Sequence, residues 1–437
     1  MSPDRYCAST AEWQYKRQRR LTMKRRVVIT GMGTINPIGK NTTETWASVE
    51  QGACGIGPIT AYDTTGRKVT LAGEVKDPDF ESVIDKKDLR KMDRYTRFAV
   101  MAAQEAMEDA GLAEVKEGED RSRYGVLVSS GIGGIATIES EEIRGMERGF
   151  DRVSPYYIPM AISNMAAGQI AIRFGMQGLC SSVVTACASG TNAIGDSFRN
   201  IRDGYEDVMI AGGSEAAITE LSIGGFTSMK ALCTAQDPNR ASIPFDKERS
   251  GFVMGEGAGI LVLEELEHAK ARGAHIYGEI VGYGVSCDAY HITAPTPDGS
   301  GAAACMKRAL DDAGIAPEEM DYINAHGTST PMNDKGETAA IKLAFGDYAK
   351  KLKVSSTKAM TGHLLGASGA VEAVITTLAL KNSFVPATIH YEMPDEECDL
   401  DIVPNQGEKK ELQYAMSNSL GFGGHNASIV FRKYEEA

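Results

Sequence analysis

Two stretches of the chain repeat the same pattern of apolar and polar positions. Residues 98–111 and residues 301–314 both place small and apolar side chains at helical spacing, and both end in Asp-Ala-Gly. Apolar residues that recur every three or four positions predict an amphipathic helix, and a glycine after the last turn favours its end. The pattern therefore predicts two similar helices, which stop at Gly111 and Gly314.

Short apolar runs typical of buried strands stand before and after each predicted helix. Four runs of this kind occur, two before the helices and two after them: 26–33, 278–284, 124–130 and 320–325. Strands that alternate with helices predict parallel sheets with helices on their faces. We therefore expect an α/β protein of two similar halves, 23–274 and 275–437.

The composition is that of a globular protein with a large core. The 437 residues are 42% apolar and 24% charged, and no run of eighteen apolar residues occurs. A run of that length would be needed for a membrane-spanning helix, so we expect no membrane insertion. The net charge of −13 argues against nucleic-acid binding, because nucleic acids require a basic surface.

The eight cysteines are scattered along the chain and form no C-x-x-C pair. In a chain of this length, that pattern is typical of reduced thiols in a cytoplasmic protein. We therefore expect neither a disulfide framework nor a metal site.

The first 22 residues differ in composition from the rest of the chain. They are polar, contain no apolar stretch that could serve as a signal peptide, and carry a basic cluster at Lys16, Arg17, Arg19 and Arg20. We expect residues 1–22 to be a disordered N-terminal extension that precedes the fold. A basic targeting segment is the alternative.

Two glycine-rich turns, at Gly31 and Gly131, resemble weak dinucleotide-binding patterns. Such a site needs a last glycine that opens a helix and an acidic residue about 20 positions later. Pro37 and Gly39 interrupt any helix after Gly31, and acidic residues follow Gly131 too early. We therefore expect no nucleotide cofactor.

Cys187 stands where an apolar run, residues 183–186, meets a helical pattern rich in small residues. We expect a strand that leads into a helix, with the thiol uncrowded at the junction. A helix N-terminus stabilises a thiolate and lowers the pKa of the thiol. The pattern is typical of a nucleophile, although a structural cysteine is the alternative for the motif alone.

Two histidines lie in polar turns that follow predicted strands. His326 belongs to the stretch 324–330, and His363 belongs to the stretch 355–369, which also contains Lys358. A cysteine together with histidines forms an acyl-transfer nucleophile. The combination therefore favours an enzyme over a scaffold protein.

Four motifs in this order resemble the β-ketoacyl-[acyl carrier protein] synthases of the thiolase superfamily, most closely the synthase II type. They occupy 185–190, 324–330, 358–363 and 418–424. The resemblance implies a homodimer with a thiolase-like five-layer αβαβα fold. It implies decarboxylative Claisen condensation of an acyl group with malonyl-[acyl carrier protein] in fatty-acid chain elongation. No cofactor is implied, because the carrier-protein substrates bring their own phosphopantetheine.

The resemblance also implies roles for individual residues. Cys187 would be the nucleophile, and its backbone N–H would form the oxyanion hole together with that of Phe422. His326 and His363 would donate hydrogen bonds to the enolate that decarboxylation creates. Lys358 would keep both histidines neutral, and we expect Glu337 to be its partner.

The substrate-binding residues follow from the same resemblance. Thr328 and Thr330 match positions that bind the pantetheine arm, and Phe422 matches a gate to the acyl pocket. The pocket itself would be formed by Ile132, Phe226 and, from the partner subunit, Tyr157 and Ile158. His425 stands where the family commonly has threonine, which leaves the contacts of this loop open.

A basic face is predicted for docking of the acyl carrier protein. Four residues recur at helical spacing: Lys87, Arg90, Lys91 and Arg94. The first three match docking positions of the family, and Arg152 and Lys230 are weaker candidates. A solvated helix neutralised by neighbouring aspartates is the alternative.

Other condensing enzymes fit the sequence less well. A thiolase would have a second cysteine within 421–426, and a synthase III would have asparagine in place of His363. A chain-length partner subunit would lack Cys187. A polyketide ketosynthase shares the Cys-His-His set, so it stays open as the alternative function.

Overall fold

The computed structural model describes residues 24–435. The predicted extension over residues 1–22 lies outside the described residues. Within them, ten strands form one sheet in the order β10-β9-β13-β14-β8-β1-β7-β6-β4-β5. The strands are β1 (Val27–Ile35), β4 (Tyr124–Ser129), β5 (Cys180–Ser181), β6 (Val208–Glu215), β7 (Gly257–Glu265), β8 (Gly278–Cys287), β9 (Tyr322–Asn324), β10 (Lys353–Ser355), β13 (Tyr414–Gly421) and β14 (His425–Arg432).

The strand order shows an internal repeat. The five strands of each half can be numbered by their order along the chain. Followed from the outer edge of the sheet to its centre, both halves then have the order third, second, fourth, fifth, first. In both halves the fifth strand is antiparallel to its two neighbours, and the second strand is parallel to its own two. The halves meet where β1 pairs with β8, with Val27 opposite Ile280. The prediction of two similar halves is confirmed. The expected parallel sheets are wrong, because each half combines parallel and antiparallel pairs.

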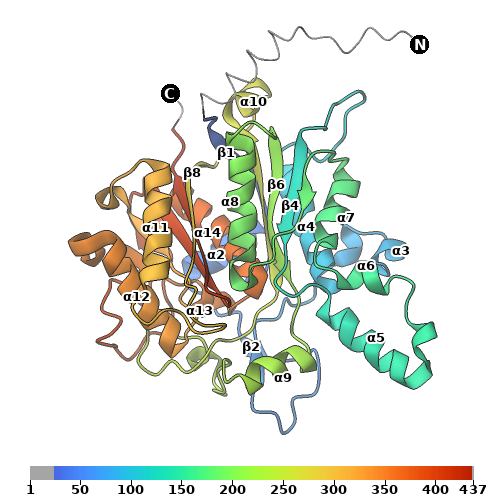
Figure 1. Ribbon diagram of the computed structural model, residues 1–437, viewed down its shortest axis with the longest axis horizontal. Coiled ribbons are helices and arrows are strands. Elements are labelled where there is room, and N and C mark those ends of the chain that lie inside the picture. The colour runs from blue at the N-terminus through green and yellow to red at the C-terminus, as the bar shows by residue number, and fades with distance from the viewer. Residues whose placement is uncertain (1–23, 436–437) are drawn as a thin grey trace.

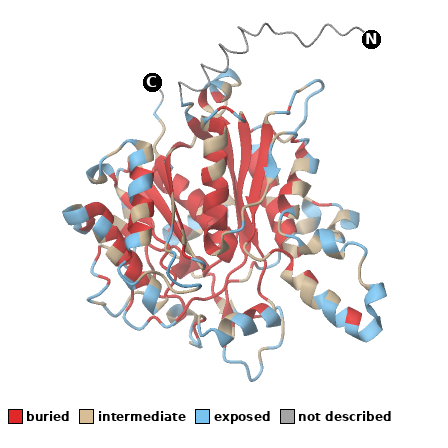
Figure 2. Ribbon diagram, in the orientation of Figure 1, coloured by how far each residue is buried: buried red, intermediate tan, exposed pale blue. Residues whose placement is uncertain are grey.

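Helices cover the sheet in layers (Figure 1). The buried helices α8 (Ser189–Arg202) and α14 (Ser368–Asn382) lie between the two halves and contact strands of both. The outer helices are α4 (Arg94–Asp109) and α7 (Met165–Phe174) on one side, and α11 (Ser300–Ala313) and α12 (Pro331–Phe345) on the other. The five strands of each half form one β layer of the continuous sheet, with α8 and α14 between the two layers and the outer helices outside them. These layers give the expected αβαβα arrangement, and Figure 2 shows the strands and central helices as its buried core.

Shorter elements complete the fold. The remaining helices are α2 (Thr42–Gln51), α3 (Lys86–Leu89), α5 (Ile135–Arg148), α6 (Tyr157–Ala161), α9 (Glu220–Ser228), α10 (Leu266–Ala271) and α13 (Lys358–Thr361), and the minor strands are β2 (Gly57–Pro58), β3 (Leu71–Ala72), β11 (Phe384–Val385) and β12 (Glu408–Lys409). Among residues 24–435, no helix combines the length and apolar character needed to cross a bilayer.

Glycines explain why the repeated strand and helix pack so closely. Gly31 and Gly33 of β1 face α4, and Gly282 and Gly284 of β8 face α11 in the same way. A Cβ atom added at any of the four would lie between 2.0 and 2.3 Å from a carbonyl oxygen of the facing helix. The Gly-x-Gly pattern near Gly31 therefore serves helix packing.

The two repeated helices form where the pattern predicts them. Helix α11 ends at Gly314, whose left-handed backbone lets its N–H reach two carbonyls of the last turn. Helix α4 begins at Arg94, one turn earlier than expected, because the side chain of Asp93 accepts a hydrogen bond from the N–H of Tyr95.

Candidate active site

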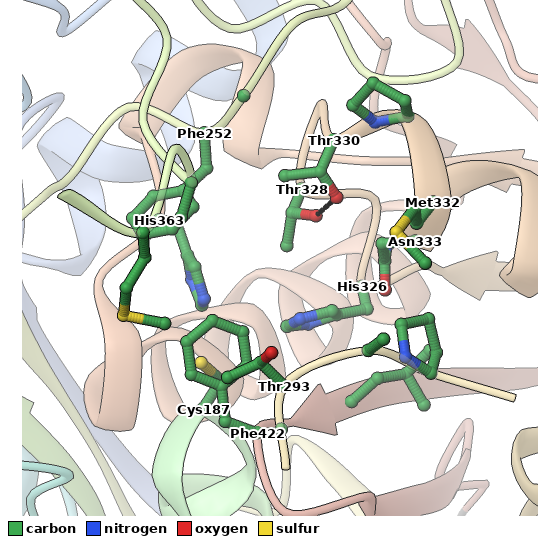
Figure 3. Close-up of a pocket in the computed structure, with 18 of the residues that line it drawn as sticks. Cys187, Phe252, Thr293, His326, Thr328, Thr330, Met332, Asn333, His363 and Phe422 are labelled. Atoms are coloured by element: carbon green, nitrogen blue, oxygen red, sulfur yellow. Dashed lines mark hydrogen bonds between the residues drawn. The ribbon is translucent and has the colours of Figure 1, made fainter. Parts of the chain in front are cut away.

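One cavity of about 380 Å³ brings together most of the residues that the sequence singles out. Its lining includes Cys187, His326, His363, Thr328, Thr330, Phe226, Phe422 and Lys230. Figure 3 shows both imidazoles pointing into the cavity from opposite sides, with Cys187 and Phe422 close together below them. Segments far apart in sequence thus converge on one thiol.

Cys187 lies in a short 3-10 turn, Ala186–Ala188, directly before α8. Ala186 has a φ of 51°, a strained conformation for a residue with a side chain, so the turn resembles the elbow that presents other nucleophiles. The predicted strand over 183–186 is wrong. Side chains of α8 bind this segment instead: Ser189 accepts the N–H of Thr185, and Asn192 donates to the Thr185 hydroxyl.

The electrostatic environment of Cys187 differs from the expectation. Burial raises the pKa of its thiol to about 12, although Lys358 and the backbone N–H groups of Phe422 and Cys187 act in the opposite direction. The prediction of a lowered thiol pKa is therefore wrong for the resting enzyme, because desolvation outweighs the helix N-terminus. The two N–H donors are nevertheless directed at the sulfur, where an oxyanion hole would need them.

The two histidines form an edge-to-face pair. Their ring centroids are 5.2 Å apart and their planes meet at 87°. Burial lowers the pKa of both well below the ordinary value of 6.5, and the nearby charge of Lys358 lowers it further. Both imidazoles are therefore neutral at neutral pH, and each has one N–H group to donate.

The Nδ1 atom of His363 lies 2.8 Å from the Ser368 hydroxyl. If that hydroxyl donates, the proton of the imidazole sits on Nε2, which faces the cavity. Within residues 24–435, Nδ1 of His326 has no hydrogen-bond partner. Sequence reasoning missed Ser368, although it opens the helix that follows the His363 motif.

Lys358 is buried and forms an ion pair with Glu372 of α14. The expected pairing with Glu337 is wrong. Glu337 lies on α12 and accepts the backbone N–H groups of His326 and Gly327, each at 2.8 Å, so it holds the histidine backbone. Burial raises the pKa of Glu372 to about 7, while Lys358 opposes that shift. The sequence does contain a signal for this pairing, because Glu372 is the single acidic residue in the otherwise uncharged, buried part of α14.

The two threonines lie side by side, with hydroxyl oxygens 2.9 Å apart (Figure 3). Ser329 between them has a φ of 66°, so both neighbours can face the cavity. The buried Arg249 donates to the carbonyls of Thr330 and Pro331 at 3.4 and 3.2 Å. Arg249 thereby stabilises this segment, a role that the sequence did not indicate.

Aromatic rings line one side of the cavity. Phe422 lies 6.3 Å from Phe226, Phe226 lies 5.5 Å from Phe252, and Phe252 lies 5.2 Å from His363, measured between ring centroids. Ile132 packs into the apolar cluster that contains Cys187, without lining the cavity. These side chains provide apolar surface beside Cys187.

Two of the expected pocket residues lie apart from this cavity. Tyr157 and Ile158 belong to α6, and 60% of the Ile158 surface is exposed. His425 opens β14 and does not line the cavity either.

The expected basic face is formed only in part. Helix α3 ends at Leu89, and Arg94 opens α4 and forms an ion pair with Glu256, so the four-residue helix face is wrong. Lys91 pairs with Asp88 at 2.8 Å. The candidates that stand exposed are Lys87, Arg90, Arg152 and Lys230.

Comparisons with known proteins agree with this geometry. The family model described as the N-terminal domain of beta-ketoacyl synthases matches residues 24–269, and the C-terminal domain model matches residues 277–392. The 3-oxoacyl-[acyl-carrier-protein] synthase 2 of Staphylococcus aureus (strain COL) is 54% identical over 415 residues, which is 95% of this chain and 100% of the relative. The protein of the same name from Synechocystis sp. is 53% identical over 413 residues, 94% of this chain and 99% of the relative.

Solved structures show the same fold. A beta-ketoacyl synthase from Burkholderia phymatum STM815 has a TM-score of 0.86 at 34% identity, and the match covers 94% of this chain and 100% of that one. The ketosynthase of a type II polyketide synthase, solved with its acyl-carrier protein, has a TM-score of 0.87 at 37% identity, with the same coverage. The chain belongs to the beta-ketoacyl synthase family.

Proposed function

We propose that this chain condenses acyl-[acyl carrier protein] with malonyl-[acyl carrier protein] to give β-ketoacyl-[acyl carrier protein] in fatty-acid chain elongation. The observation that carries the proposal is the convergence of Cys187, His326 and His363 on one cavity, with two backbone N–H donors at the sulfur. The fatty-acid assignment is favoured because the 3-oxoacyl-[acyl-carrier-protein] synthases are 53–54% identical to this chain, against 37% for the polyketide ketosynthase.

In the first step, Cys187 attacks the thioester carbonyl of the acyl carrier protein. The bond between carbon and the Cys187 sulfur forms, and the carbonyl oxygen becomes an oxyanion that the N–H groups of Cys187 and Phe422 stabilise. The bond to the phosphopantetheine sulfur then breaks. The thiol proton of Cys187 ends on the departing phosphopantetheine sulfur, so the net charge of the site is unchanged.

In the second step, malonyl-[acyl carrier protein] loses carbon dioxide. The electron pair of the broken carbon–carbon bond becomes an enolate, whose oxygen accepts hydrogen bonds from His326 and His363. The enolate carbon attacks the acyl group on Cys187, so a carbon–carbon bond forms and the carbon–sulfur bond to Cys187 breaks. The thiolate that leaves takes up one proton from solvent water. Neutral imidazoles suit this step, since they donate without quenching the carbanion with a proton.

The substrates occupy different parts of the site in this proposal. Thr328 and Thr330 bind the pantetheine arm, and the acyl chain runs past Phe226 toward Ile132. Lys87, Arg90, Lys91, Arg152 and Lys230 form the carrier-protein docking surface, where positive charge suits an acidic partner. Every step uses groups of this chain, while the phosphopantetheine arrives with each substrate.

We also propose that the protein is a cytoplasmic homodimer, in which Tyr157 and Ile158 complete the acyl pocket of the partner subunit. Large apolar side chains stand exposed on and near α5 and α6: Ile143, Met146, Phe150 and Ile158. A second copy would bury them. Sedimentation analysis tests this, and a stable monomer at micromolar concentration would contradict it.

Reconstitution tests the condensation itself. The enzyme is incubated with an acyl primer and malonyl-[acyl carrier protein], and the carrier-bound products are identified by mass spectrometry. We expect one product per primer, longer by two carbons and carrying a β-keto group. Repeated unreduced additions would favour the polyketide alternative, and no condensation product would overturn the proposal.

A further inference from the structure

Glu215 ends β6, and its carboxylate is fully buried beside the nucleophile. It accepts four hydrogen bonds: from the Ser130 hydroxyl at 2.6 Å and from the N–H groups of Gly131 at 2.8 Å, Gly366 at 3.0 Å and Ile132 at 3.3 Å. Three of these donors belong to the turn after β4, and the fourth belongs to the turn after His363. One carboxylate therefore connects two turns that flank Cys187.

The two turns also pack closely against each other. A Cβ atom at Gly366 would lie 2.3 Å from the nitrogen of Gly131, and one at Gly131 would lie 3.4 Å from the carbonyl oxygen of Ala186. Backbone thus packs directly on backbone, next to the residue that precedes the nucleophile. The relative position of the two turns depends on the acceptor between them.

The first turn also leads toward α6. The N–H of Gly133 donates to the Ser130 hydroxyl at 2.8 Å, and the N–H of Gly134 donates to the carbonyl of Ala161 at 3.0 Å. Ile132 sits inside this turn and packs into the apolar cluster of Cys187. The position of the Ile132 side chain relative to the sulfur is therefore fixed from one end by Glu215 and from the other by α6.

A buried carboxylate is costly in free energy, because its charge is removed from water. Its presence here is explained if the surrounding donors need its two acceptor oxygens. Burial raises the pKa of Glu215, and the same charge contributes to the raised pKa of Cys187. Within residues 24–435, no Lys or Arg side chain offsets that charge with an ion pair. Only a carboxylate of this length presents two acceptor oxygens to four donors, since glutamine has one acceptor oxygen and an NH2 group.

We infer that Glu215 is a positioning residue for chain-length selection, which fixes the depth of Ile132 relative to Cys187. Acyl chains above a certain length then meet a defined barrier. The inference rests on the proposed function, because it assumes that the acyl chain runs from Cys187 toward Ile132.

The test is the selectivity of the Glu215→Gln variant. Ser130 and Ile132 share Oε1 of Glu215, whereas Gly131 and Gly366 share Oε2. An amide keeps one acceptor oxygen, so it leaves either the N–H of Ile132 or the N–H groups of Gly131 and Gly366 without an acceptor. We measure kcat/KM with saturated acyl primers of increasing even chain length. We expect the ratio between the best and the poorest primer to fall by about tenfold, as for a lost hydrogen bond to a charged group.

Glu105→Gln is the matched control. Glu105 is a half-buried carboxylate, which accepts the N–H groups of Thr34 and Thr42 and the Thr42 hydroxyl, but it lies on α4 away from the cavity. We expect it to leave the selectivity ratio unchanged, even if it lowers Tm.

A second variant covers the case in which Glu215→Gln fails to fold. Ser130→Ala removes one donor to Glu215 and the support of Gly133 while keeping the charge, and we expect a smaller fall of the ratio. An equal loss of kcat/KM for all primers, or an unchanged ratio in both variants, would overturn the inference. A wild-type enzyme that elongates no primer would instead overturn the proposed function.

Discussion

Cys187 keeps its proton at neutral pH, because burial raises the pKa of its thiol to about 12. Only the thiolate reacts with an alkylating agent, and its fraction rises about tenfold per pH unit below the pKa. We therefore expect the alkylation rate of Cys187 by iodoacetamide to increase through the ordinary thiol pKa of 9.0 without levelling off. Peptide mass spectrometry at several pH values measures it, with the exposed Cys287 as an internal reference. A plateau near neutral pH would contradict the account.

In the proposed mechanism the histidines act only in the second step, so their loss should separate the two half-reactions. We expect His326→Ala and His363→Ala each to slow carbon dioxide release from malonyl-[acyl carrier protein] by about 10²-fold, as for a lost oxyanion donor. Acylation of Cys187 should fall much less. Because burial lowers the pKa of both imidazoles well below 6.5, carbon dioxide release by the wild type should stay constant as the pH falls toward 6.5. Normal release by both variants would show that the histidines have another role.

Motifs predicted which side chains meet in the cavity, but not which partners hold them. Glu337 and Glu372 are both buried, and the charge of Lys358 acts to lower the pKa of each, yet only Glu372 forms an ion pair with Lys358. The choice depends on how α12 and α14 pack, which no local pattern records. The pKa of Cys187 was missed for a related reason, since desolvation depends on the whole surrounding structure.

At the scale of elements, periodicity predicted the repeated strands and helices, because helix spacing and glycine end signals are local. The strand expected over 183–186 was wrong, because hydrogen bonds from α8 side chains replace those of a sheet. The prediction of a single basic helix face was wrong because Asp93 caps a new helix that begins at Arg94. Both errors arise from long-range or capping contacts that compete with the apolar pattern.

The close packing of the repeat gives a prediction at this scale. A Cβ atom at Gly33 would lie 2.0 Å from the carbonyl oxygen of Ala102 on α4, so Gly33→Ala must push the helix away. We expect it to lower the free energy of unfolding by about 1–3 kcal/mol. Gly224→Ala is the control, since Gly224 lies within α9 with no atom within 4 Å of its added Cβ. Helix propensity should make that variant neutral or slightly stabilised, and equal destabilisation of both would contradict the packing account.

At the scale of the whole molecule, charge holds one end of the sheet together. Asp207 precedes β6 and accepts hydrogen bonds from Arg25, which precedes β1, and from Arg123, which precedes β4. Burial opposes ionisation of Asp207, but the two guanidinium groups outweigh it and lower the pKa to about 2. Three strands are thus tied at one point by a carboxylate.

The lowered pKa has a consequence for stability. A carboxyl group whose pKa is lower in the folded state stabilises the fold above its unfolded pKa, here near 3.8, and that contribution is lost as the pH falls toward about 2. Urea unfolding of the wild type and of Asp207→Asn should therefore differ most above pH 3.8 and converge below it. A difference between the two proteins that does not depend on pH would show that the ion pairs contribute little.

Intact-protein mass spectrometry tests the central claim, that Cys187 carries the acyl group between two carrier proteins. After incubation with acyl-[acyl carrier protein], we expect the wild type to gain the mass of one acyl group, located on the peptide that contains Cys187. Addition of malonyl-[acyl carrier protein] should remove that mass and release a β-ketoacyl product two carbons longer. Cys187→Ala should show neither event, and an acyl adduct on that variant would contradict the account.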